Sequence, residues 1–193
     1  TRIAYLYPDT GGADLKLNGY RRALTEAGIK PDDAGLLKVF PTPYWREVID
    51  RAVTSDGITA ICASCDDYAV KLMKYLAFRG IRVPDDVAVF GYDGMRYVED
   101  LAVPLSTVVQ PVERIAYLLC HKMKAKLDGD AQRIPAVLAP ELYLGRSCGC
   151  QPAGRLSIDW SMTPLAMQMP DRQDEFRHRH EEPTAAMSKM SSK

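Results

Sequence analysis

The chain has little of what marks membrane, disulfide-rich or nucleic-acid-binding proteins. No apolar run approaches the roughly 18 residues that a membrane-spanning helix needs. Five cysteines are an odd number without paired CxxC motifs, so we expect no disulfide scaffold and favour a reducing cytoplasm. The formal net charge is zero, from 25 basic and 25 acidic residues, which argues against a nucleic-acid-binding face in this stretch.

The motifs of common nucleotide and acyl-transfer sites are also missing. The sequence contains no GxGxxG, no GxxxxGK[ST] and no GxSxG. The absence of these motifs argues against a dinucleotide-binding site, a nucleoside triphosphate site and a serine nucleophile. Cys148 and Cys150 are only two thiols at too short a spacing for zinc, although a pairing or a redox role stays open. We therefore predict no catalytic group, no metal site and no cofactor.

Apolar runs alternate with helical patterns through the first half of the chain. The runs at 2–7, 35–40, 59–65 and 87–93 predict strands, and the segments between them carry apolar residues at helical spacing. Strict strand–helix alternation predicts an α/β fold: a Rossmann-like parallel sheet with right-handed crossovers and helices on both faces.

The pattern changes after Pro104. The segment 105–111 is expected to be extended, a helix follows from Pro111 to about 128, and short strands are expected at 136–139 and 141–145. We place one folded domain at 1–150 and interpret 151–193 as a disordered tail or linker, because it lacks sustained periodicity.

Acidic and aromatic residues stand where the predicted strands end. Phe40, Asp66 and Asp93 each close an apolar run, and open parallel sheets bind ligands beyond the carboxyl ends of their strands. Carboxylates accept hydrogen bonds from hydroxyl groups, and aromatic faces pack on the apolar faces of sugars. This rim therefore suits a polyhydroxylated small molecule.

Lys16 is a further candidate at this rim. It lies in the first turn of its predicted helix, where a positive charge opposes the helix dipole, and four residues before Tyr20 on the extension of the buried stripe. A cation so placed is expected to contact the ligand.

Simpler roles remain open for the same residues. Asp66 and Asp67 can cap the helix that follows them, Asp93 can form a turn with Gly94, and Phe40 can belong to the core.

Three segments together resemble the effector-binding module of LacI/GalR-type transcription regulators. They are KLNGYRRALTEAGI (16–29), TAICASCDDYAVKLMKYLAFRGIRVPDDVAVFGYDG (59–94) and VPLSTVVQP (103–111), and the similarity extends from about residue 2 to 149. The resemblance implies a type I periplasmic-binding-protein-like fold, whose two lobes close on a small sugar or related metabolite. It also implies a cytoplasmic homodimer in which the effector controls how a separate helix-turn-helix binds operator DNA.

The same resemblance assigns site residues. Lys16 stands where the family usually has Arg, Asp66 matches the Asp of the usual Asn-Asp pair, and Asp93 matches the Asp of a Gly-aromatic-Asp strand end. Phe40 falls near the family's stacking aromatic residue, and Gln110 matches the Gln that follows PLST.

Two features depart from the family pattern. Lys16 lacks the planar fork with which Arg grips two oxygens, and Cys65 stands where Asn is common, so the effector is expected to be unusual or weakly bound. The helix-turn-helix and the first half of the N-terminal lobe are not found in this sequence. We therefore expect a fragment in which the helix of 112–127 exposes an apolar stripe and promotes self-association. No membrane is expected among its partners.

Two other functions stay open at this point. The same module can serve as the sugar-sensing input domain of another signalling protein. A doubly wound enzyme using Asp66 and Asp93 as an acid–base pair is the third possibility, but no nucleophile, metal cluster or phosphate loop accompanies them.

Overall fold

The computed structural model describes residues 2–8, 15–31, 35–39, 42–129 and 137–157. Its strands are β1 (Ile3–Pro8), β2 (Leu36–Val39), β3 (Ala60–Ala63), β4 (Ala88–Asp93), β5 (Ser106–Val109), β6 (Glu141–Leu144) and β7 (Gly154–Ser157). Its helices are α1 (Leu15–Glu26), α2 (Trp45–Thr54), α3 (Asp66–Phe78) and α4 (Val112–Leu127), with a short 3₁₀ turn η2 (Arg96–Val98).

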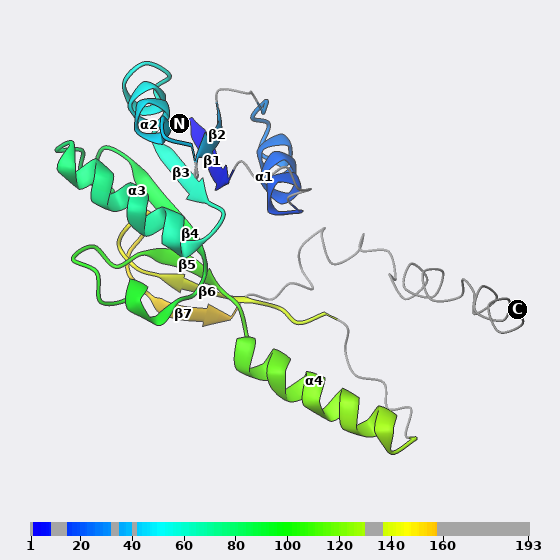
Figure 1. The fold of residues 1–193 in the computed structure, drawn as a ribbon. Helices are drawn as coiled ribbons and strands as arrows, with labels where there is room; N and C mark the ends of the chain where they lie inside the picture. The colour runs from blue at the N-terminus through cyan, green and yellow to red at the C-terminus, as the bar shows by residue number, and fades with distance from the viewer. Residues whose placement is uncertain (1, 9–14, 32–34, 40–41, 130–136, 158–193) are drawn as a thin grey trace, which may run out of the picture. The chain divides into compact units, whose positions relative to one another are not determined.

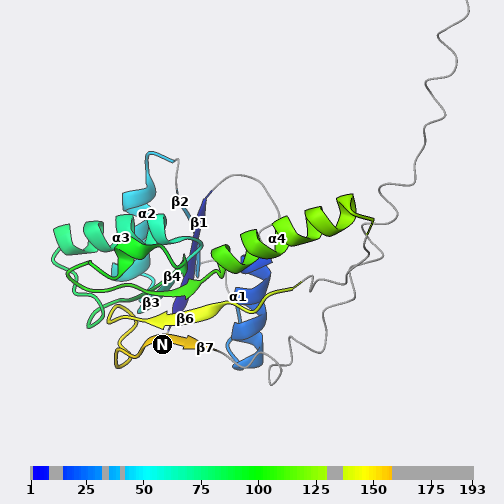
Figure 2. The same ribbon diagram turned by 90° about the horizontal axis from the view of Figure 1, so that it is seen from below.

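The strands form one sheet in the order β2-β1-β3-β4-β5-β6-β7, drawn in Figure 1. The pairs from β2 to β5 are parallel, and β6 and β7 are added antiparallel. Helix α1 covers one face of the sheet and α2 and α3 cover the other, as Figures 1 and 2 show together. The predicted α/β fold with helices on both faces is confirmed.

The hydrophobic core lies between the sheet and the helices α2 and α3. Leu6, Ile61 and Val89 come from three adjacent strands, while Ile49 and Leu72 come from the helices, and all five are at most 1% exposed. Continuous apolar runs in the sequence produce this arrangement because parallel strands are covered on both sides.

On the far side of the sheet, α1 is held through its one aromatic residue, Tyr20. Tyr20 stacks on Tyr5, with ring centroids 5.4 Å apart, and its hydroxyl donates a hydrogen bond of 2.7 Å to the carbonyl oxygen of Ile3. These contacts hold the middle of α1 against the first residues of β1. The start of the helix carries Lys16 to the segment after β3, the rim where it was predicted to lie.

The C-terminal edge of the sheet differs from the sequence expectation. Strand 141–145 is found, but the described residues 137–139 of the expected strand 136–139 are not in a strand. Strand β7 was not expected, because it lies beyond residue 150, yet it pairs with β6 from Gly154 to Ser157. The predicted disorder of residues 158–193 lies outside the described residues.

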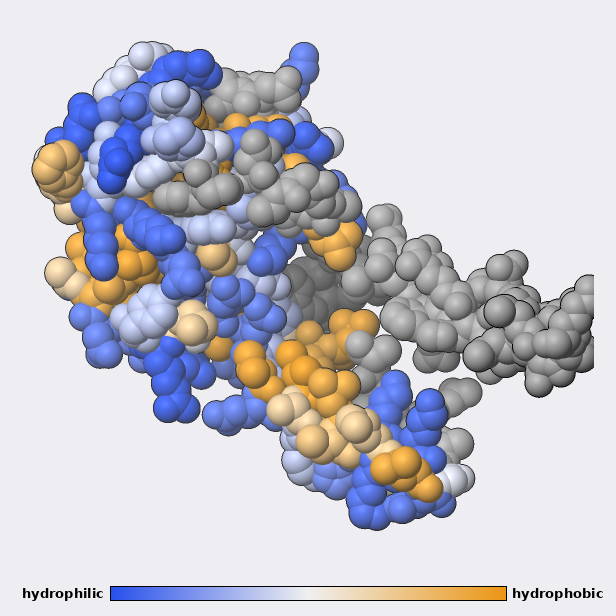
Figure 3. Space-filling model, viewed as in Figure 1, coloured by the Kyte–Doolittle hydropathy of each residue, from blue (hydrophilic) through white to orange (hydrophobic). Residues whose placement is uncertain are grey.

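Helix α4 buries none of its side chains. The stripe of apolar residues predicted for this helix is present and exposed, and Figure 3 shows apolar side chains gathered along it. Its most exposed members are Leu127, Met123, Val112 and Leu119. Among the helices of the described segments, none combines the length and hydrophobicity required to cross a membrane.

Candidate functional site

The sheet order creates a natural ligand position. From β1 the chain first adds β2 on one side of it and then crosses over to add β3 on the other side. The order of the strands therefore reverses between β1 and β3. Ligands of open parallel sheets bind at such a switch point, beyond the carboxyl ends of the strands. The ends of β3, β4 and β5 are neighbours there, because these strands pair in that order.

Lys16 lies at this switch point. Its ammonium group donates a hydrogen bond of 2.7 Å to the carbonyl oxygen of Ser64, the residue that follows β3. It also stands 4.1 Å from the centroid of the Tyr92 ring, a cation–π contact with β4. Helix α1 thus delivers a positive charge to the ends of two strands, as the sequence predicted.

Asp93 and Gln110 meet at the ends of β4 and β5. The Gln110 amide nitrogen Nε2 donates a hydrogen bond of 2.7 Å to Asp93 Oδ1, and the Gln110 backbone N–H donates to the Asp93 carbonyl oxygen at 3.2 Å. The two residues therefore form one polar unit at the ends of adjacent strands, close enough to Lys16 for its charge to act on Asp93.

Two features set Asp93 apart from an ordinary surface aspartate. Burial raises the pKa of its carboxyl group above the usual value, while the hydrogen bond from Gln110 and the charge of Lys16 act in the opposite direction. Its backbone φ of 127° is rare for a residue other than glycine. Strained backbone is often found where a side chain must face a ligand.

Asp66 plays a different part, because its side chain is fully buried. Its Oδ2 accepts hydrogen bonds from the backbone N–H groups of Gly94 (2.9 Å) and Met95 (2.8 Å), and the Thr107 hydroxyl donates to Oδ1 at 2.6 Å. These partners lie after β4 and on β5, so Asp66 does not act as the cap of its own helix. It fastens the segment directly after Asp93 to α3.

Gly91 makes room for this buried carboxylate. A Cβ atom at position 91 would lie 2.3 Å from Asp66 Oδ1 and 2.9 Å from a methyl carbon of Leu105. No local sequence pattern indicates this role of Gly91, because Asp66 lies on another element. The close fit of Gly91 and Asp66 explains why a glycine occurs inside a central strand.

The other predicted residues are placed as follows. Asp67 is exposed in the first turn of α3 and interacts with the Tyr97 hydroxyl. Phe40 lies outside the described residues, so its stacking role stays a prediction. The structure adds Tyr92 to the rim as the aromatic partner of Lys16.

Two hollows lie near these elements. A hollow of about 410 Å³ includes Asp93, Gln110 and Glu113 among its lining residues and so adjoins the rim. A larger groove of about 680 Å³ lies beside α3 and includes none of the rim residues. Among the described residues, no cluster of His, Cys, Asp and Glu side chains is suited to hold a metal ion.

The chain is similar to a family of known domains and to several regulators. A family model for periplasmic binding protein-like domains matches residues 1–148. The HTH-type transcriptional regulator DegA of Bacillus subtilis is 32% identical over 152 residues, which is 76% of this chain and 45% of DegA.

Solved structures give the same result. A sugar-binding transcriptional regulator of the LacI family from Escherichia coli, complexed with phosphate, superposes with a TM-score of 0.67 at 27% identity, covering 76% of this chain and 54% of that one. The regulator CelR in complex with cellobiose gives a TM-score of 0.65 at 28% identity, covering 76% and 46%. The resemblance to LacI/GalR-type regulators is therefore confirmed, and the similar proteins are regulators rather than enzymes. The chain spans about half the length of these relatives.

Proposed function

We propose, since the chain belongs to the family of periplasmic binding protein-like domains, that it is the effector-sensing part of a LacI/GalR-like transcription regulator. Its ligand would be a small sugar or a related hydroxylated metabolite, bound at the ends of β3, β4 and β5. The observation that carries the proposal is the gathering of Lys16, Asp93 and Gln110 at the switch point of the sheet.

Each rim residue would contribute a different interaction. Asp93 accepts hydrogen bonds from ligand hydroxyls, since a carboxylate offers about four acceptor positions and Gln110 uses one of them. Lys16 donates to ligand oxygens as a single charge on a flexible stem, whereas Arg would hold two oxygens in a fixed plane. Asp66 positions Asp93 without touching the ligand, because its oxygens are buried and engaged.

Regulation would follow from lobe closure. A ligand that binds the closed state more tightly shifts the population toward it, and the affinity of DNA-binding elements for their operator changes by the same coupling. Operator binding would belong to a helix-turn-helix outside this sequence, in keeping with the zero net charge of the chain. Such a regulator acts in the cytoplasm.

A sugar screen tests the site. We expect thermal shifts of the chain with one or more members of a panel of mono- and disaccharides that includes cellobiose, because the related CelR structure holds that sugar. The variants Lys16→Ala and Asp93→Asn should each abolish the shift. Lys30→Ala, an exposed lysine before β2, is the matched control and should keep it. Equal ligand-induced shifts in melting temperature in all variants would show that Lys16 and Asp93 do not bind the sugar.

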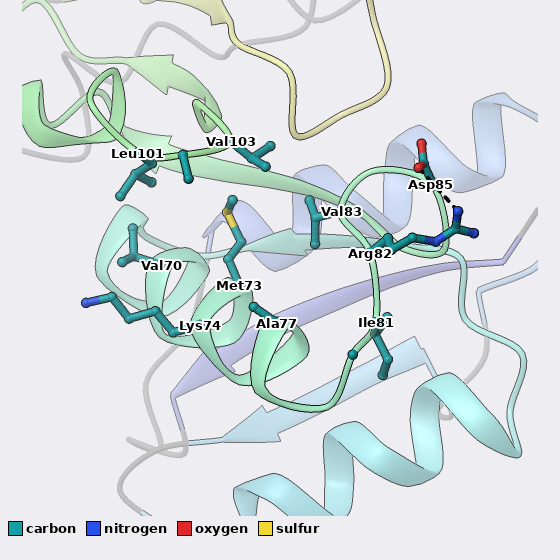
Figure 4. A pocket seen from close by; sticks show the side chains of 12 residues that line it. Val70, Met73, Lys74, Ala77, Ile81, Arg82, Val83, Asp85, Leu101 and Val103 are labelled. Atoms are coloured by element: carbon teal, nitrogen blue, oxygen red, sulfur yellow. Dashed lines mark ion pairs between the residues drawn. The ribbon is translucent and has the colours of Figure 1, made fainter.

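We further propose that the working regulator is a homodimer joined through the groove beside α3. The groove is lined mainly by apolar side chains, including Val70, Met73 and Leu101. Figure 4 shows Lys74 at one end and Asp85 at the other. Arg82 also lines the groove and pairs with Asp85 at 3.6 Å, so the proposal rests on the apolar lining. A two-fold axis would bring the same apolar surface of two copies together, as a self-complementary interface requires.

A further inference from the structure

The segment Cys148-Gly149-Cys150 is fixed to the sheet at the end opposite the ligand rim. The preceding residue, Ser147, is fully buried, and its hydroxyl donates to the Val89 carbonyl oxygen at 2.6 Å. The backbone N–H of Ser106, the first residue of β5, donates to the Ser147 hydroxyl at 2.9 Å. The Val89 N–H donates to the Ser147 carbonyl oxygen at 2.8 Å. The two cysteines therefore directly follow a residue whose position is fixed by three hydrogen bonds.

The backbone turns so that the two thiols meet. Gly149 has a φ of 79°, a left-handed conformation that glycine adopts without strain. The two thiols are one residue apart on this turn, and each affects the pKa of the other. The Ser106 hydroxyl donates to Cys148 Sγ at 3.1 Å. Cys148 is half-buried and Cys150 is exposed, so small reagents can reach the pair.

The surroundings give the two sulfurs different reactivity. Burial raises the pKa of the Cys148 thiol, but hydrogen bonds from the Ser106 hydroxyl, the Cys150 backbone and the Cys150 thiol outweigh it and leave that pKa below the usual value. The neighbouring Cys148 raises the pKa of the Cys150 thiol. By contrast, burial raises the pKa of the Cys62 thiol to about 11, which makes it inert at neutral pH.

We propose that Cys148 and Cys150 form a reversible dithiol–disulfide couple that exchanges with low-molecular-weight disulfides such as oxidised glutathione. The geometry that carries this is the anchored turn, the left-handed glycine and the placement of two accessible thiols only one residue apart.

The exchange balances in two steps. The Cys148 thiolate attacks one sulfur of the disulfide, forms a mixed disulfide and releases one thiolate of the reagent. Cys150 then loses its proton to water and attacks Cys148 Sγ, which forms the internal disulfide and releases the second thiolate. The reagent is reduced by two electrons, and the two cysteines are oxidised by two.

This couple is expected to be labile rather than structural. Only one residue separates the two cysteines, so the disulfide closes a small ring, and strained or exposed disulfides are the ones that reducing pools readily reopen. Oxidation also changes the sulfur that the Ser106 hydroxyl contacts at the start of β5.

Mass spectrometry tests the proposal on the full chain. The chain is equilibrated with mixtures of oxidised and reduced glutathione, the free thiols are alkylated, and trypsin then releases residues 147–155, which carry both cysteines. We expect a form of this peptide that is two hydrogen masses lighter and unalkylated, and that returns to the alkylated form when reduced glutathione is in excess.

Single variants identify the order of events. Cys150→Ser should accumulate the mixed glutathione disulfide at Cys148, whereas Cys148→Ser should slow glutathione uptake at this segment by about tenfold or more. Cys120→Ser, at an exposed cysteine on α4, is the control and should leave the couple unchanged. A peptide that stays fully alkylated in excess oxidised glutathione, or a Cys150→Ser chain without mixed disulfide, would overturn the proposal.

Discussion

The buried carboxylate of Asp66 organises the residues around the candidate site. Its three hydrogen bonds join α3 to the segment after β4 and to β5, and Gly91 leaves the space that the carboxylate occupies. These bonds hold α3, the segment after β4 and strand β5 in fixed positions relative to one another. The consequences can be measured one residue at a time.

Two glycines should respond in opposite directions to the same substitution. Gly91→Ala forces a methyl group against Asp66 Oδ1 and Leu105 and should destabilise the fold by about 1–3 kcal/mol. Gly19→Ala meets nothing within 4 Å on helix α1 and should stabilise it by about 0.5–1 kcal/mol. Urea unfolding of both variants is the measurement. Equal effects would contradict the close fit at Gly91.

Removing the charge of Asp66 should cost more than removing that of its neighbour. Asp66→Asn replaces a charged acceptor by a neutral amide, which weakens the hydrogen bonds from the Gly94 and Met95 amides and should lower the free energy of unfolding by about 1.5–3 kcal/mol. Asp67→Asn, exposed in the same turn of α3, should cost less than about 1 kcal/mol. Chemical denaturation at neutral pH measures the free energy of unfolding of both variants. Equal losses in Asp66→Asn and Asp67→Asn would contradict the prediction.

At the scale of elements, α4 is the least integrated part of the described fold. Leu119→Glu should reduce concentration-dependent association of the chain, because it interrupts the exposed apolar stripe. Its stability should change by only about 0.5 kcal/mol, since no side chain of α4 is buried. Sedimentation velocity over a range of concentrations measures the effect.

His121→Glu is the matched control for this helix. It introduces the same acidic group two residues further along α4, away from the stripe. Association should persist in this variant, and its loss in both variants would show that charge alone, rather than the stripe, controls self-association.

Local sequence patterns were sufficient to predict most of the elements. The strands that end near Asp66 and Asp93 and the helices between them follow from periodicity, because apolar runs and helical stripes reflect burial directly. Strand β7 could not be predicted in this way. Its GRLS sequence is short and largely exposed, and only pairing with β6 makes it a strand.

The candidate site was predicted less completely than the fold. Asp66, Asp93 and Lys16 were recognised from their positions at strand and helix ends. The burial of Asp66 was not, because its partners Gly94 and Thr107 lie 28 and 41 residues away. Likewise, the contact of Lys16 with Ser64 spans 48 residues, and no local pattern encodes it.

At the scale of the whole molecule, the proposed homodimer depends on the groove beside α3. Met73→Glu places a carboxylate in the middle of that groove and should convert dimers to monomers in sedimentation equilibrium. Phe78→Glu, on the same helix but 84% exposed and outside the groove, should leave the dimer intact.

The two forms of association can be separated. The dimer should persist in the Leu119→Glu chain, because that substitution lies on α4 and not in the groove. Thermal melting of Met73→Glu followed by circular dichroism shows whether the monomer is folded. A folded Met73→Glu chain that remains dimeric would refute the groove as the interface.

The hydrogen bonds to Asp66 also have a consequence for solvent exchange. Backbone amides in a connecting segment normally trade their hydrogens with deuterated water within seconds. The amides of Gly94 and Met95 follow β4 outside any strand or helix, yet both donate to a carboxylate that water does not reach. They should therefore retain their hydrogens about as long as the central strands do, and become labile in the Asp66→Asn chain.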